Sequence, residues 1–250
     1  MIQARFYETY YFCNIIRNVL HDQFRYLRNL NDFYGDEAYL GLGSPFMKYS
    51  AFHSFIEFIV DDVFYENASS IDLNKRKDNL ERFSEIPSAL ADGRYDKLPI
   101  EVALDFHGIE HLSFKEYLEK RKKGFSECDE DDIYEFMAEL RLTGEYERLV
   151  DQTVKEVFHV LFQNRELLLL FNDMIAKAIE FQSDYGVPEE FAELFNENGT
   201  LKRKPIPRWV QRAVFFRDRG RCVLCDKDLS GTINFENIEN YDHIVPLARY

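Results

Sequence analysis

Residues 44–64 read SPFMKYSAFHSFIEFIVDDVF, and this stretch decides the expected fold. Its apolar side chains recur every three or four residues, a spacing that places them on one side of an α-helix. Ser44 followed by Pro45 is typical of a helix start, because proline has no backbone N–H to leave unsatisfied in the first turn. We therefore expect a core helix to begin at Ser44 and Pro45. Its buried face would be Phe46, Tyr49, Phe52, Phe55, Ile56, Ile59 and Phe64.

The same helical period recurs on both sides of this stretch. Residues 4–33 predict one long amphipathic helix, and the glycines of residues 35–45 predict the loop that ends it. Pro99 and Gly108 are interpreted as breaks between helices. Because strict two-residue alternation is absent, we expect a large all-helical domain over residues 1–196 and a mainly α fold. Further helices are expected over residues 71–91, 113–123, 129–141, 145–181 and 187–195, the last opened by Pro188.

The composition indicates a globular protein. Of the 250 residues, 46% are hydrophobic and 30% are charged, with 23 Phe and 15 Tyr, which is too rich in core formers for a disordered chain. No apolar run approaches the roughly 18 residues that span a bilayer, and the N-terminus lacks the pattern of a signal peptide. Cys13 and Cys128 stand alone and Cys222 and Cys225 form a C-x-x-C pair, so we expect reduced thiols and a cytoplasmic location.

Charge is distributed unevenly along the chain. Residues 201–250 hold ten Lys or Arg and six Asp or Glu, a balance of +4, so the total of −14 leaves −18 on residues 1–200. An acidic body repels a polyanion, whereas a basic segment attracts one by releasing counterions from its phosphates. If nucleic acid binds, we expect it to bind at the C-terminal end, through Lys202, Arg203, Lys204, Arg208 and Arg212.

Residues 197–207 predict a basic linker, because they are polar and contain Gly199 and two prolines. A short helix follows over residues 207–217. We expect its arginines, with Arg219 and Arg221, to stay outside. The side chains expected to face a small core are Trp209, Val210, Ala213, Val214 and Phe216.

Two motifs that carry chemistry follow this helix. Two residues separate Cys222 from Cys225, so both sulfurs can reach one tetrahedral ion at about 2.3 Å, as in a zinc knuckle. After a polar loop, Asp242 and His243 begin the run D-H-I-V-P-L on a short β-branched stretch. Neighbours on a strand point to opposite faces, so a bulge or a strand end is needed for Asp242 and His243 to serve one site.

The order R-D-x-G-R-C-x-x-C, polar loop, D-H-I-V-P-L resembles the HNH endonuclease family, in the subclass with a structural zinc, over residues 207–250. The resemblance implies a ββα-metal fold that hydrolyses nucleic acid, which we expect to be DNA. It also implies that His243 is the general base, that Asp242 holds one Mg²⁺ or Mn²⁺, and that Cys222 and Cys225 are half of a Zn²⁺ site. A neutral imidazole and an adjacent carboxylate suit these roles.

The sequence also departs from this pattern. In the family, a glycine-rich turn, a second strand, a second C-x-x-C and a helix follow the D-H strand, whereas this chain stops at Tyr250. We interpret it as the front half of the domain, deliberately shortened, and expect these 250 residues to be inactive although the full-length protein is a hydrolase. A reading frame that continues past Tyr250 into those features would support this interpretation.

Two functions stay open. A helical body in front of a nuclease is typical, by analogy, of bacterial antiviral defence effectors whose body docks a partner. The rival is a non-enzymatic helical protein that binds a partner or self-associates and carries a structural zinc knuckle. His107 and His111 lie four residues apart, but no third ligand is obvious, and we expect them to be surface groups.

Overall fold

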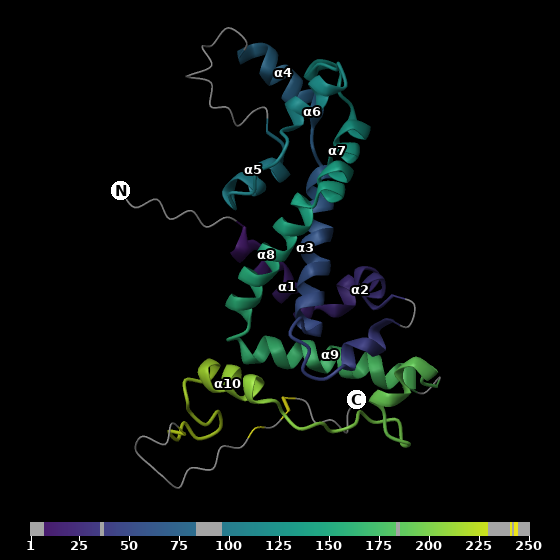
Figure 1. The fold of residues 1–250 in the computed structure, drawn as a ribbon, viewed down its shortest axis with the longest axis vertical. Helices are drawn as coiled ribbons and strands as arrows, with labels where there is room; N and C mark the ends of the chain where they lie inside the picture. The colour runs from purple at the N-terminus through teal and green to yellow at the C-terminus, as the bar shows by residue number, and fades with distance from the viewer. Residues whose placement is uncertain are drawn as a thin grey trace. The chain divides into compact units, whose positions relative to one another are not determined.

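The computed structural model describes residues 8–35, 38–83, 97–183, 186–229, 241, 243 and 244. These residues are mainly helical, which confirms the expected mainly α class (Figure 1). Pairing of the β type among them is limited to two isolated antiparallel bridges, Phe195 with Leu201 and Arg221 with Asp228. The ββα module expected at the C-terminal end stays a prediction. None of the described helices is long and apolar enough to cross a membrane.

The chain divides into two compact units. Unit 1 holds residues 1–12 and 57–156, and unit 2 holds residues 13–56 and 157–250. Helices α1 (Thr9–His21), α3 (Ala51–Ser69) and α8 (Glu145–Leu161) contribute residues to both units. This division does not follow the expected boundary at residues 197–207. That residues 208–250 fold as a module of their own stays a prediction.

Unit 1 has its own apolar core, and within it α6 packs beside α7 (Figure 1). Its elements are α4 (Leu73–Phe83), α5 (Pro99–Phe106), α6 (Phe114–Lys120), η4 (Phe125–Glu127), α7 (Glu130–Thr143) and its share of α1, α3 and α8. The core side chains include Phe64, Leu98, Leu104, Phe114, Ile133, Phe136, Leu140 and Leu149. These helices confirm the expected ones over residues 113–123 and 129–141. Residues 84–91 of the expected helix over 71–91 lie outside the described residues.

A buried carboxylate joins α5 to α6. Glu101 is 1% exposed, and its two oxygens accept the backbone N–H groups of Leu98 at 2.6 Å and Phe114 at 2.9 Å. Burial raises the pKa of Glu101, and the two hydrogen bonds only partly offset that effect. The expected break at Pro99 is the start of α5. Proline suits the first turn of a helix, and the Glu101 side chain caps the same turn.

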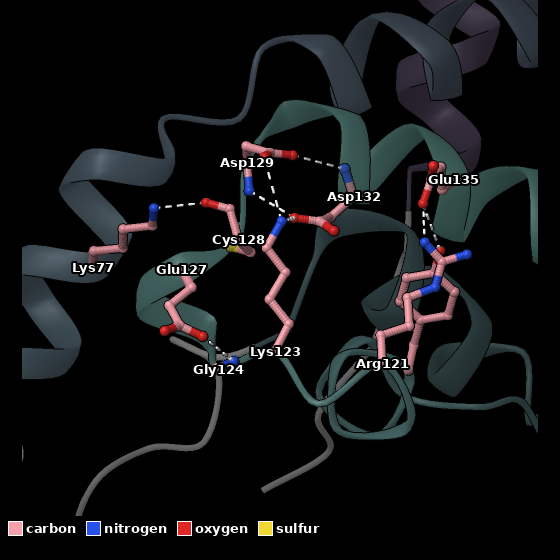
Figure 2. A network of polar contacts seen from close by, with 10 residues as sticks. Lys77, Arg121, Lys123, Gly124, Glu127, Cys128, Asp129, Asp132 and Glu135 are labelled. Carbon is pink, nitrogen blue, oxygen red and sulfur yellow. Dashed lines mark hydrogen bonds and ion pairs between the residues drawn. The ribbon is translucent and has the colours of Figure 1, made fainter.

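Figure 2 shows the polar network that starts α7. Asp129 and Asp132 exchange hydrogen bonds between side chain and backbone, which satisfies N–H groups that a helix start leaves without partners. The Lys123 ammonium bonds to both carboxylates, and Lys77 Nζ donates to the Cys128 carbonyl at 2.6 Å. Gly144, at φ 87°, ends the helix. The expected helix over 129–141 is therefore bounded by a cap at each end.

Unit 2 holds η1 (Gln23–Tyr26), α2 (Leu27–Tyr34), η2 (Ala38–Gly43), α9 (Arg165–Ser183), η5 (Glu189–Leu194), α10 (Arg208–Arg217) and its share of α1, α3 and α8. Within it, η2 packs on α9 (Figure 1). The Phe52 and Phe55 rings of α3 lie 4.9 and 5.4 Å from the Phe171 ring of α9. Its buried side chains also include Ile16, Leu20, Leu30, Leu40, Ile175 and Ile179.

The single helix expected over residues 4–33 is wrong. α1 ends at His21, and Asp22 takes a non-helical conformation at φ −132°, after which the chain forms η1 and then α2. Phe24, which the helical period placed on the buried face, is 84% exposed. Burial of Leu20 and Leu30 is therefore achieved by two helices, and residues 4–7 of the expected helix lie outside the described residues.

The expected helix start at Ser44 and Pro45 is also wrong. Phe46 has φ 56°, a left-handed conformation that no helix accommodates, and α3 begins at Ala51. His53 Nδ1 accepts the Ser50 N–H at 3.1 Å and lies 2.8 Å from Ser50 Oγ, so the helix is capped at Ser50. The cap at Ser50 was missed because Ser44 and Pro45 offered an earlier and more familiar start signal.

The structure differs from three further expectations. The helical stretch over 145–181 consists of α8 and α9, because Asn164 Oδ1 accepts the Leu167 N–H at 3.1 Å and starts a new helix. The expected linker begins with an ordered turn: Asn196 N donates to Thr200 O at 2.7 Å and Lys202 N to Leu194 O at 2.8 Å. In this hairpin the Leu201 side chain is buried, with 8% of its surface exposed. Apolar packing therefore holds the chain just before the basic residues 202–204. The short helix expected over 187–195 is the 3-10 turn η5, with Pro188 at its cap.

Candidate functional site

Helix α10 confirms the helix expected over residues 207–217, and an ion cluster anchors its end. The Asp218 carboxylate accepts hydrogen bonds from Arg217 Nε at 2.8 Å and from Arg165 Nε at 3.0 Å, at the first turn of α9. Burial alone would raise the pKa of Asp218, but the two guanidinium groups outweigh it and lower that pKa. The Arg217 guanidinium also lies over the Phe162 ring, 5.4 Å from its centroid.

The expected faces of α10 are only partly correct. Arg208 and Arg212 are exposed as expected, but the Arg217 side chain is only 8% exposed. Trp209 and Phe216, expected in a small core, are 46% and 74% exposed. The cause is the anchor at Asp218, which holds Arg217 inward and turns Phe216 toward the surface.

A glycine sets the turn after α10. Gly220 is buried, has φ 66°, and donates its N–H to Phe215 O at 2.8 Å. A Cβ built on it would lie 2.8 Å from Cζ of the Phe215 ring, so any other residue at position 220 would have to displace that ring. Its carbonyl accepts the Leu229 N–H at 2.7 Å, which brings the chain back and closes a hairpin.

The hairpin of residues 220–229 holds both cysteines of the C-x-x-C motif. Arg221 bridges Asp228 in antiparallel fashion, and Cys222 N donates to Lys227 O at 2.8 Å. Asp226 N returns to Cys222 O at 2.9 Å, and Asp226 adopts φ 57° to close the turn. Cys222 is half-buried and Cys225 is exposed. The tight turn expected around the C-x-x-C pair is therefore present.

The hairpin favours an ionised sulfur at Cys222. Backbone N–H groups of Leu224 and Cys225 donate to this sulfur, and the Cys225 side chain hydrogen-bonds to it. These contacts, with a smaller contribution from the nearby Arg165 guanidinium, lower the pKa of Cys222. By contrast, burial raises the pKa of Cys13 to about 11 and also raises that of Cys128. Both are buried free thiols, as expected.

The donor chemistry at the hairpin fits one half of a thiolate zinc site. Two hydrogen-bonded cysteines on one turn, one with a lowered pKa, are the ligands that Zn²⁺ prefers. Among the described residues, no group of three or more His, Cys, Asp or Glu lies close enough together to hold a metal. The hairpin thus supplies two of the four ligands of a closed zinc site.

His243 lines a small cavity of unit 2. The cavity has a volume of about 30 Å³ and is lined on one side by Gly43, Pro45 and Phe46 of the loop before α3. The other side comes from the hairpin after η5: Leu194, Leu201, Lys202 and Lys204. Asp242 lies outside the described residues, so its expected partnership with His243 stays a prediction.

The five basic residues expected to bind nucleic acid fall into separate groups. Lys202, Arg203 and Lys204 are all exposed, and of these three only Lys202 and Lys204 line the cavity of His243. Arg208 and Arg212 are exposed on α10. Sequence reasoning missed the residues 43–46 that wall the cavity, and only the positive φ of Phe46 sets them apart from an ordinary loop. It also missed Arg165, which carries no motif.

The expectation that His107 and His111 are surface groups is wrong for His107. Its side chain is only 4% exposed, and Nδ1 lies 3.5 Å from Glu156 Oε1, which pairs the two within unit 1. His111 Nδ1 lies 2.9 Å from the carbonyl oxygen of Ile109. The two imidazoles therefore contact different partners and form no common metal site among the described residues.

Comparisons of the chain with models of protein families, with curated proteins and with solved structures found no match. The resemblance to HNH endonucleases therefore stays a prediction from the residues.

Proposed function

We propose that the protein is a metal-dependent endonuclease of the HNH type that hydrolyses phosphodiester bonds in DNA. The observation that carries the proposal is the hairpin of residues 220–229, which presents Cys222 and Cys225 on one tight turn. That turn stands where a zinc knuckle would precede the D-H pair. Ligands to complete the zinc site would have to come from outside the described residues.

The proposed roles follow from side-chain chemistry. His243 takes a proton from the attacking water, because an imidazole is the side chain best suited to accept a proton near neutral pH. Asp242 would hold the catalytic Mg²⁺ or Mn²⁺, which supplies positive charge against the phosphate oxygens when bound. Lys202 and Lys204, at the cavity of His243, bring positive charge to the same place. Cys222 and Cys225 would hold a structural Zn²⁺.

A cleavage assay tests this proposal. The protein, expressed from its complete reading frame, is incubated with supercoiled plasmid and Mg²⁺ or Mn²⁺, beside His243→Ala and beside His111→Ala as a matched histidine control. We expect nicked and linear products from the wild type and from His111→Ala, and none from His243→Ala or after chelation of the metal. Equal cleavage by all three proteins, or none by any, contradicts the proposal.

A second candidate rests on a different observation. Four apolar side chains near the hairpin are exposed: Trp209 (46%), Phe216 (74%), Val223 (53%) and Leu224 (93%). Exposed large apolar groups that gather in one segment indicate a binding surface. On this alternative, the protein is a non-enzymatic module whose zinc knuckle docks a partner protein or a second copy. The cleavage assay distinguishes the two candidates, because only the first predicts cleavage that depends on His243. A partner that binds the wild type but not Leu224→Asp supports the second candidate.

A further inference from the structure

The cavity of His243 is built by two segments that hold each other in place. The hairpin after η5 buries Phe195 and Leu201, which are 5% and 8% exposed. A Cβ on Gly43 would lie 3.2 Å from Cδ2 of Leu201, so the loop before α3 packs tightly against the hairpin. The Lys202 N–H bond to the Leu194 carbonyl, at 2.8 Å, continues this pairing to the first lysine. Apolar packing of Leu201 and this hydrogen bond therefore hold the backbone as far as Lys202.

Lys202 and Lys204 both line the cavity, whereas Arg203 does not. Arg203 lies between the two lysines and has the same charge. It therefore serves as a control for the effect of charge without a contact to the cavity.

The two lysines also differ from other lysines of the chain in what balances their charge. Lys97, Lys123, Lys155 and Lys177 each lie in an ion pair with a carboxylate. Within the part of the chain that the structure describes, neither Lys202 nor Lys204 forms an ion pair. None of the described residues that line this cavity is an Asp or Glu, and two ammonium groups at one cavity attract an anion.

We propose that Lys202 and Lys204 are positioning residues that together hold one phosphate group of the nucleic acid against His243, and that Arg203 has no part in this contact. The inference deepens the proposed nuclease function and rests on it. A volume of about 30 Å³ admits a phosphate oxygen or a water molecule but not a nucleobase, so the contact is to the backbone and carries no sequence preference.

A binding experiment compares charge-matched changes. The probe is a short fluorescein-labelled DNA duplex, and its binding is measured by fluorescence anisotropy over a series of salt concentrations. The variants are Lys202→Ala/Lys204→Ala and Arg203→Ala. We expect the double variant to bind about tenfold more weakly or worse, and its salt slope to fall by about two, the value for two lost phosphate contacts. Arg203→Ala should change the salt slope by less than one, the value for a single lost phosphate contact. Lys202→Arg/Lys204→Arg should restore binding.

A second readout localises the contact at His243. Inorganic phosphate is titrated at fixed pH while the imidazole signals are followed by NMR, with His243→Ala used to assign them. We expect the His243 signals to shift in the wild type and in Arg203→Ala, and to stay in place in the double lysine variant. Equal behaviour of Arg203→Ala and the double variant, or no DNA and no phosphate binding by the wild type, overturns the inference.

The outcomes separate this inference from the nuclease proposal. Cleavage that depends on His243 but is indifferent to both lysines would leave the nuclease and remove the phosphate contact. Phosphate binding that depends on the lysines in a protein without cleavage would leave the contact and remove the nuclease. Unchanged thermal unfolding of the double variant shows that its effects are not caused by misfolding.

Discussion

At the scale of single residues, Asp218 holds the end of α10 to the start of α9. Its side chain is 8% exposed and lies between the guanidinium groups of Arg217 and Arg165. A buried carboxylate with two such donors is stabilised in its ionised form, so its pKa is lowered below the ordinary 3.8. The hairpin that carries Cys222 begins directly after this residue.

We predict that Asp218→Asn lowers the free energy of unfolding by about 2–3 kcal/mol at neutral pH, because it leaves the buried Arg217 without its charge partner. A lowered carboxyl pKa contributes stability that is complete above the unfolded-state value of 3.8 and is lost as the pH falls through the folded-state value. The difference between variant and wild type should therefore shrink below pH 3.8. Urea unfolding at neutral and acid pH measures it.

Asp226→Asn is the control for that change. Asp226 pairs with Arg221 at 2.7 Å, but both side chains are exposed, and an exposed pair contributes little. Equal losses in the two variants, or a difference that grows toward acid pH, would refute the assigned role of Asp218.

Gly220 gives a second prediction at this scale. Gly220→Ala should lower the free energy of unfolding by about 2–3 kcal/mol, because the new Cβ meets the Phe215 ring at 2.8 Å and the backbone stays at positive φ. Gly108→Ala is the matched control: its φ of 64° is nearly the same, but no atom lies within 4 Å of the new Cβ. It should lose only about 1 kcal/mol. Equal losses in urea unfolding would show that the ring contact is unimportant.

Which residues the sequence could predict depended on how local their interactions are. Cys222 and Cys225 were predictable as a pair, because they are close in the sequence and the hydrogen bonds that close their turn lie within residues 222–227. Asp218 and Arg165 were not, because they are far apart in the sequence and no periodic pattern joins them. The exposure of Phe216 follows from that missed contact, since Arg217 occupies the inward direction instead.

At the scale of elements, helices with capping residues at their ends were predicted well. Asp129 and Gly144 bound α7 by side-chain capping and by a left-handed C-cap, and both signals are readable from the sequence. The break at Asp22 and the start of α3 at Ser50 were missed, because they depend on the exposure of Phe24 and on an imidazole cap. Hydrophobic period alone cannot separate one long helix from two short ones that bury the same face.

The hairpin of residues 220–229 leads to a prediction about zinc. We expect Cys222→Ser and Cys225→Ser each to lower the zinc content of the purified protein, because each removes a thiolate ligand. Cys13→Ser and Cys128→Ser should leave the zinc content unchanged, since both thiols are buried and have a raised pKa. Native mass spectrometry measures the bound metal. A wild type without zinc, or equal loss in all four variants, would contradict the zinc assignment.

At the scale of the whole molecule, the distribution of charge limits where a polyanion can bind. Residues 1–200 carry −18 and residues 201–250 carry +4. If the protein binds nucleic acid, attraction by the C-terminal segment therefore acts against repulsion by the rest of the chain, and the salt dependence reports the number of phosphates that the basic residues contact. The sign of this balance was predictable from the sequence, but the division of the basic residues between the His243 cavity and α10 required the structure.

We predict that Arg208→Ala/Arg212→Ala weakens binding of a DNA duplex and lowers the salt slope by up to about two, because both side chains are exposed on α10 and available to phosphates. Lys155→Ala/Lys177→Ala removes the same formal charge from the acidic part of the chain and should leave the affinity unchanged, since both lysines pair with carboxylates. Fluorescence anisotropy measures both variants. Equal weakening would show that only net charge matters.

The rate of a single turnover tests the central claim most directly. A labelled DNA duplex is mixed with an excess of the protein and Mg²⁺ or Mn²⁺, and the cleavage rates of the wild type and His243→Ala are compared. Loss of a general base predicts a rate lower by about 10²–10⁴-fold in His243→Ala, with duplex affinity retained. A rate in His243→Ala equal to that of the wild type would contradict a nuclease that uses His243 as its base.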